Sequence, residues 1–169
     1  MNPFFQILTH IDRIVGRAMR GLCVFCIVCL LILLTGNVVF RFVPIFSMGW
    51  YDEIVELLFA WLVFIGAAAL WREKSHFRVD WIYSKLENRY VGTYVCIMID
   101  LLSLFFLFVM THQGLRLTLL ANATTPILNL PKRITYVDIP IAGAIMILYC
   151  VRDIVRHILS LRQATRLSR

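Results

Sequence analysis

The sequence predicts an all-α membrane protein with four transmembrane helices, short amphipathic interfacial helices and both termini in the cytoplasm. Of its 169 residues, 60% are hydrophobic and 16% are charged, and the mean hydropathy of +0.80 is too high for an ordinary soluble domain. Apolar runs of helical length, joined by short polar connections, use almost the whole chain. We therefore predict a single transmembrane domain over residues 1–169.

The first span follows a basic amphipathic stretch. Residues 3–19 carry apolar side chains at helical spacing on one face and charged ones, such as Asp12, on the other. This pattern indicates either a helix that lies along the membrane surface or a simple extension of the first span. The span itself is predicted over 21–43, and Pro44 ends it. It lacks a small-residue cleavage site, so we expect it to be retained as an anchor.

The second span, predicted over 50–72, begins with an acidic cluster of Asp52, Glu53 and Glu56. A short connection makes the first two spans an antiparallel hairpin, which places Arg41 at the depth of these acids. We therefore predict at least one ion pair between Arg41 and the cluster. The charges either hold the hairpin at the interface or form a cation or proton site.

Small residues and then bases follow in this span. Gly66 and Ala67 open a run of small residues, which allows helices to approach closely in lipid. This face is expected to lie against another helix, in this chain or in a partner. The basic loop that follows carries aromatic residues at near-helical spacing, which predicts an interfacial helix over 77–89.

The third span, predicted over 91–115, contains Asp100. A charged carboxylate that lies two to three turns into a membrane helix costs several kcal/mol when it faces lipid. No basic residue is expected at the same depth, so Asp100 is assigned to a structural hydrogen bond or a partner contact, with proton relay as the alternative. The fourth span is predicted over 134–156, with Pro140 in its first turns.

The basic residues predict the orientation. Of the 17 Lys and Arg, thirteen flank the side that the two termini share, and Arg41, Arg116, Lys132 and Arg133 lie on the other. The positive-inside rule then places both termini in the cytoplasm. Because the bases flank hydrophobic runs, we expect contacts with membrane lipids and none with nucleic acid.

The sequence predicts no catalytic, cofactor-binding or metal-binding residues, so an enzyme is not expected. Cys23, Cys26 and Cys29 lie in one apolar helix and are interpreted as small buried hydrophobes. His112 is expected near the opposite membrane surface from the other histidines, which argues against a bis-histidine haem. The polar midplane groups and internal repeat of a complete transporter are also missing.

One family signature is carried by the second span and the loop after it. Its residues are Trp50, Asp52, Glu53, Ile54, Phe59, Trp61, Phe64, Ile65, Gly66, Ala67, Ala68, Arg72, His76 and Val79. They resemble the small membrane subunit, the Q or DctQ-like subunit, of tripartite ATP-independent periplasmic (TRAP) transporters. The four spans, the basic middle loop and the predicted cytoplasmic termini extend this resemblance over the whole chain.

The resemblance implies a role in the bacterial inner membrane. In this family a large M subunit carries the substrate and sodium sites and moves as an elevator, and a periplasmic substrate-binding protein delivers the solute. The small subunit is then an accessory scaffold of a sodium-coupled importer of carboxylated solutes, of the C4-dicarboxylate or sialic acid class.

The residues expected to contact the partner subunit or neighbouring helices are Arg41, Asp52, Glu53, Glu56, Trp61, Gly66, Ala67, Arg72, His76, Asp80 and Asp100. Two alternatives stay open. One is a self-sufficient, homo-oligomeric ion-coupled transporter that uses Glu56 or Asp100. The other is a membrane anchor for a redox enzyme.

Overall fold

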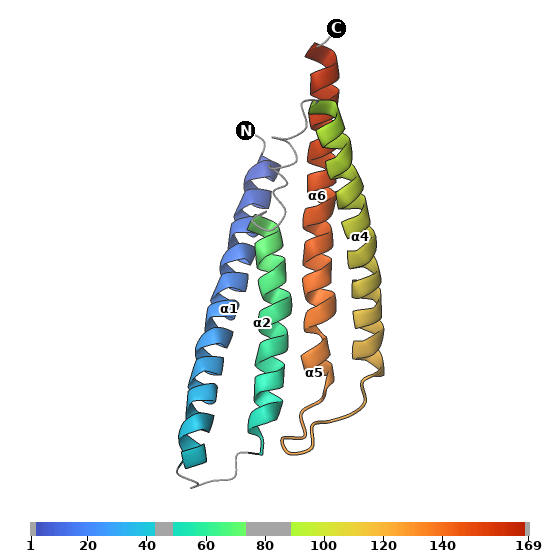
Figure 1. The fold of residues 1–169 in the computed structure, drawn as a ribbon. Coiled ribbons are helices and arrows are strands. Elements are labelled where there is room, and N and C mark those ends of the chain that lie inside the picture. Colours follow the sequence, from blue (N-terminus) through green and yellow to red (C-terminus); the bar gives the residue numbers. More distant parts are fainter. Residues whose placement is uncertain (1–2, 43–48, 74–88, 168–169) are drawn as a thin grey trace.

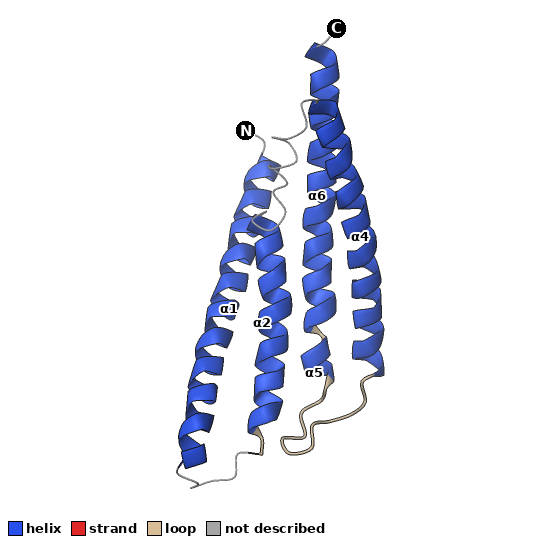
Figure 2. Ribbon diagram, in the orientation of Figure 1, coloured by secondary structure: helices blue, strands red, loops and turns tan. Residues whose placement is uncertain are grey.

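The computed structural model describes residues 3–42, 49–73 and 89–167, which consist of helices and loops (Figures 1 and 2). The helices are α1 (Pro3–Phe42), α2 (Tyr51–Glu73), α4 (Arg89–Leu120), α5 (Arg133–Tyr136) and α6 (Asp138–Leu167). The segments long and apolar enough to cross a membrane number four: Thr9–Phe42, Tyr51–Glu73, Ile97–Leu120 and Arg133–Val155. The predicted all-α fold with four membrane-spanning helices is confirmed.

α1 is one continuous helix of 40 residues. At 1.5 Å per residue it is about 60 Å long, roughly twice the thickness of the hydrocarbon core of a bilayer. Of the two interpretations of residues 3–19, the structure has the extension of the first span, because no proline or cap stops the helix near Gly21. The interfacial helix predicted over 77–89 falls almost entirely outside the described residues, since α4 begins at Arg89.

The four long helices lie in a row, in the order α1, α2, α6, α4, and do not close into a ring (Figure 1). Among the described helices, α1 packs closely on α2 alone, and α4 packs on α6 and the short α5. The two outer helices therefore present large apolar side chains to their surroundings, including Val24, Phe25, Leu31, Ile32, Leu102, Phe105 and Phe108. In a bilayer, such a surface faces lipid or another membrane helix.

The core runs along the middle of this row. Its buried members are Met19 of α1, Ile65 and Ala68 of α2, Leu107 of α4, and Ala142, Met146 and Cys150 of α6. α4 and α6 approach each other closely at two glycines, because Gly114 lies against Ile139 and Gly143 lies against Thr111. A methyl group at either glycine would collide with the facing side chain, so these contacts fix the distance between the two helices.

A break at Val137 separates α5 from α6, and this break is compatible with Pro140, which lies three residues further on. Pro140 has no N–H to donate to the carbonyl four residues earlier, that of Tyr136. The hydroxyl of Thr118, from α4, lies 3.1 Å from this oxygen and 2.8 Å from the carbonyl oxygen of Gly114. The hydroxyl has a single hydrogen that it can donate to either oxygen, so α4 offers the Tyr136 carbonyl a donor in place of the missing proline N–H and contacts the start of the last long helix.

Candidate functional site

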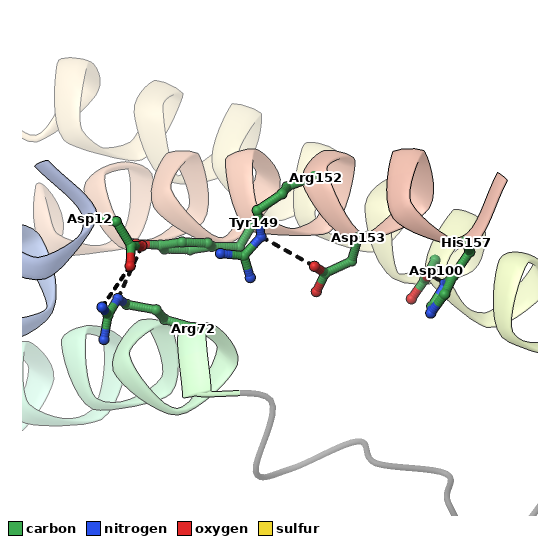
Figure 3. Close-up of polar contacts among 7 residues, drawn as sticks. All are labelled: Asp12, Arg72, Asp100, Tyr149, Arg152, Asp153 and His157. Carbon is green, nitrogen blue, oxygen red and sulfur yellow. Dashed lines mark hydrogen bonds and ion pairs between the residues drawn. The ribbon is translucent and has the colours of Figure 1, made fainter. Parts of the chain in front are cut away.

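Three helices meet at a polar cluster near the end of the molecule where α1 begins and α6 ends. Its members are Asp12 of α1, Arg72 of α2 and Tyr149 of α6, which we call the three-helix cluster (Figure 3). Arg72 donates from Nε to Asp12 Oδ1 at 3.1 Å and from Nη2 to Asp12 Oδ2 at 2.7 Å. The Tyr149 hydroxyl donates to Asp12 Oδ1 at 2.7 Å. One carboxylate therefore joins all three helices, through a bidentate arginine and a phenol.

A glycine makes room for this contact. Gly16 lies one helical turn after Asp12, and a Cβ added there would collide with the guanidinium of Arg72. The arginine can therefore cross the surface of α1 and reach Asp12 with both donor groups. Only 16% of the Arg72 side chain and 36% of the Asp12 side chain are exposed, so the pair is better shielded from solvent than an ordinary surface salt bridge.

Further charges surround the three-helix cluster. The guanidinium of Arg152 lies 4.7 Å from the centre of the Tyr149 ring, and its Nε is 3.2 Å from Asp153 Oδ1 (Figure 3). On the other side, Arg20 and Glu73 form a more exposed ion pair of 2.9 Å between α1 and α2. The Arg152 contacts lie within α6, whereas the Arg20–Glu73 pair adds a second link between α1 and α2 at this end.

Asp100 of α4 has a partner that we did not predict. Its Oδ2 lies 2.8 Å from Nδ1 of His157 (Figure 3). Its backbone carbonyl accepts a hydrogen bond from the thiol of Cys150 at 3.3 Å. The expectation that no basic residue shares its depth is therefore wrong. α6 continues to Leu167, beyond the predicted end of the fourth span, and this extension places His157 beside Asp100.

At the opposite end, Glu53 holds the loop formed by residues 121–132. Its carboxylate accepts the backbone N–H of Ile127 at 2.8 Å and that of Leu128 at 3.0 Å. Arg133 supports the same loop by donating to the carbonyl of Ala121 and to the side-chain oxygen of Asn122. Glu53 therefore connects the start of α2 to the connection between α4 and α5.

The ion pair predicted between Arg41 and the acidic cluster is absent from the described part of the chain. Glu53 is directed to backbone amides of the 121–132 loop, and the side chains of Asp52 and Glu56 are exposed, as is that of Arg41. Two amide donors at hydrogen-bond distance bind the Glu53 carboxylate directly, and the nearby base is Lys132 of the loop rather than Arg41. Among the described residues, Glu53 is the member of this acidic cluster that ties the start of α2 to the 121–132 loop.

Three other expected contact residues lie along α2. Trp61 donates its indole N–H to the carbonyl of Ile134 in α5 at 3.0 Å, so it connects two helices. Gly66 and Ala67 line an apolar groove between α2 and α4, and Ala67 is exposed. His76 and Asp80 lie outside the described residues.

Sequence reasoning missed Asp12, Tyr149 and His157 as contact residues. The spacing of the helices could have indicated His157, because α4 and α6 form a hairpin. Asp100 lies 20 positions before the end of α4, and His157 lies 19 positions after the start of α6. Asp12 offered a weaker signal, a lone acid on a basic amphipathic face, and nothing in the sequence pointed to Tyr149.

The polar groups of the site hold helices and a loop in place. Within residues 3–42, 49–73 and 89–167, no group of three or more His, Cys, Asp and Glu side chains is arranged to hold a metal ion. The contacts described above are mainly ion pairs and hydrogen bonds between elements. Contacts of this kind hold helices and loops in fixed positions, as expected for a rigid structural unit.

Comparison with known proteins points to one family. A family model described as the DctQ component of tripartite ATP-independent periplasmic transporters matches residues 14–160. A protein of Haemophilus influenzae that is described as a TRAP transporter small permease protein is 26% identical over 141 residues, which cover 82% of this chain and 86% of that one. The isethionate TRAP transporter permease protein DctMQ of Oleidesulfovibrio alaskensis is 22% identical over 134 residues. That match covers 74% of this chain but only 21% of the much longer relative.

Proposed function

Because the chain belongs to the DctQ component family of tripartite ATP-independent periplasmic transporters, we propose that it is the small accessory subunit of such a transporter and packs against a larger permease subunit. The observation that carries this proposal is the family match over residues 14–160, which takes in parts of every described helix. The DctMQ relative supports the association, since a region like this chain makes up 21% of a single, longer permease protein.

The arrangement of the helices supports a scaffold role. Helices in a row bury less surface than helices in a ring, and the outer ones keep apolar side chains exposed along their length. The three-helix cluster and the Glu53 contact with the 121–132 loop tie the row together at its two ends. A row of helices of this kind can bind a larger membrane protein along a broad face and needs no solute-binding site of its own.

We propose that the complete transporter is sodium-coupled and depends on a periplasmic substrate-binding protein. Its solutes would be carboxylated compounds of the C4-dicarboxylate or sialic acid class. The chain would lie in the bacterial inner membrane with both termini in the cytoplasm, because thirteen of its 17 Lys and Arg flank the side that the termini share. The chain itself would carry out no chemical reaction.

Uptake by a reconstituted complex tests this function. The chain, the larger permease subunit and the substrate-binding protein would be reconstituted into liposomes, and uptake of labelled solute would be measured with and without an inward sodium gradient. We expect uptake that needs the gradient and all three proteins. Equal uptake without this chain would contradict the accessory role, and uptake by this chain alone would favour a self-sufficient transporter.

A further inference from the structure

One face of the row of helices carries an open apolar groove. α6 lies between α2 and α4, whose backbones do not come close to each other among the described residues (Figure 1). The space between them has a volume of about 540 Å³. Its walls come from α2 and α4, and Leu107 and Met146 of the core form its floor.

From this groove we infer that the chain binds one transmembrane helix of the larger permease subunit between α2 and α4. The inference rests on the function proposed above and names the surface that the association uses. The walls consist of apolar residues: Leu62, Val63, Phe64, Gly66, Ala67, Leu70 and Trp71 of α2, and Phe106 and Met110 of α4. Because no charged residue lines the groove, its occupant must be uncharged along the contact.

The depth of the groove favours a membrane-spanning segment as the occupant. Its residues lie inside the segments of α2 and α4 that are apolar enough to cross a membrane. Those of α4 lie near the middle of its segment, and those of α2 run from the middle of its segment to Trp71, beside Arg72. A polar loop of a partner could not enter the hydrocarbon region without leaving backbone groups unsatisfied. A helix satisfies its own backbone, and a ridge of its side chains could enter the groove.

Small residues favour a helix over a lipid chain. Gly66 and Ala67 leave the backbone of α2 accessible from the groove, and a close backbone approach of this kind is typical of contacts between membrane helices. The fold does not need both residues to be small. Ala67 is exposed, and a Cβ at Gly66 would meet only the sulfur of Cys23, at 3.9 Å.

The groove and the three-helix cluster use opposite sides of α2. Arg72, which reaches back to Asp12, comes nine positions after Val63 in the groove. Nine residues are about two and a half turns, so the two side chains point in opposite directions. One side of α2 is occupied by contacts within the chain, and the other is free to take a partner.

Site-specific photo-crosslinking in the intact complex tests this inference. A benzophenone amino acid would replace Ala67 in the full chain, co-expressed with the larger permease subunit, and the products would be identified by mass spectrometry after irradiation. The matched control is the same replacement at Ala144, an exposed alanine of α6 that lies two positions before Met146 and so faces away from the groove. We expect an adduct with a transmembrane helix of the permease subunit from position 67, and at least about a tenfold lower yield from position 144.

A second variant tests the same surface without a crosslinker. Ala67→Phe fills the groove at an exposed position, so it should leave the folded chain intact while reducing co-purification of the permease subunit at least about tenfold. Ala144→Phe should leave co-purification unchanged.

The outcomes separate the inference from the proposed function. If the unmodified chain brings down no permease subunit, the proposed function fails. If it does, but Ala67→Phe binds equally well, or position 67 crosslinks only to phospholipid or to a second copy of this chain, the groove inference is overturned and the function stands.

Discussion

At the residue scale, the shielded ion pair between Arg72 and Asp12 should matter more to stability than the neighbouring exposed pair. Replacing Arg72 with Met leaves the Asp12 carboxylate without its bidentate donor, and we expect a loss of about 1–3 kcal/mol in the free energy of unfolding. Unfolding of the purified chain in mixed detergent micelles measures this loss.

The control for this prediction lies close by. The Arg20–Glu73 pair also joins α1 to α2, but 63% of the Arg20 side chain is exposed, against 16% for Arg72. Arg20→Met should cost about 0–1 kcal/mol, because exposed pairs contribute little. Equal losses from the two substitutions would show that burial does not distinguish the pairs.

The contact between Asp100 and His157 predicts a rescue. His157→Phe removes the group 2.8 Å from the Asp100 carboxylate and should destabilise the chain by roughly 1–3 kcal/mol. Asp100→Leu combined with His157→Phe replaces the polar contact with an apolar one and should recover much of that loss. A double variant that is less stable than His157→Phe would contradict a simple pair. Thermal unfolding in detergent can compare the three proteins.

Glu53 should control the mobility of the 121–132 loop. Gln offers one acceptor oxygen in place of two, so Glu53→Gln loses at least one of the hydrogen bonds from the amides of Ile127 and Leu128. We expect hydrogen exchange at these two amides to become about tenfold faster. The exposed Glu56 supplies the control, since Glu56→Gln should leave exchange in the loop unchanged. Similar rates in both variants would show that the carboxylate does not hold the loop.

At the scale of elements, two glycines with different surroundings give opposite predictions. Gly143 faces Thr111 where α4 and α6 meet, so Gly143→Ala forces the helices apart and should cost about 1–3 kcal/mol. Gly21 has nothing nearby, so Gly21→Ala should be neutral or stabilise α1 by up to about 1 kcal/mol. Unfolding measurements on the two variants check this. A stable Gly143→Ala protein would show that the two helices can separate without cost.

The helices themselves could be predicted from the sequence, whereas their side-by-side order could not. Long apolar runs bounded by charges indicate which segments can cross the membrane, although α1 and α6 continue beyond the predicted spans. Hydrophobicity does not distinguish a ring from a row, because lipid and a neighbouring helix are equally apolar. The row depends on local shape, such as the contact of Gly143 with Thr111, which only the structure shows.

The candidate site was predicted only in part, for a similar reason. Charged residues such as Glu53 and Arg72 attract notice in an apolar sequence, but their partners depend on the lengths and positions of other helices. Arg41 was paired with the acids because a short turn brings them to one depth, yet Glu53 binds backbone amides of a distant loop. The sequence does not show which backbone N–H groups will donate to a side chain, because every residue except proline carries one.

At the scale of the whole molecule, the structure suits a subunit whose surface is completed by a partner. The row of helices leaves α1 and α4 with one long neighbour each, and the groove between α2 and α4 remains open. A chain built in this way should gain stability when the larger permease subunit binds, because only the folded row presents the groove. We expect its unfolding temperature in detergent to rise in the complex, as differential scanning fluorimetry of labelled chain can measure. An unchanged unfolding temperature would mean that binding does not involve the folded helices.

Native mass spectrometry of the tagged chain, purified in mild detergent after co-expression with the larger permease subunit, tests whether the chain is a subunit of that permease. We expect one copy of this chain bound to one copy of the permease subunit, and no stable assembly of this chain by itself. Recovery of the chain only as a homo-oligomer, with the permease subunit present in the same membrane but unbound, would show that it is not such a subunit.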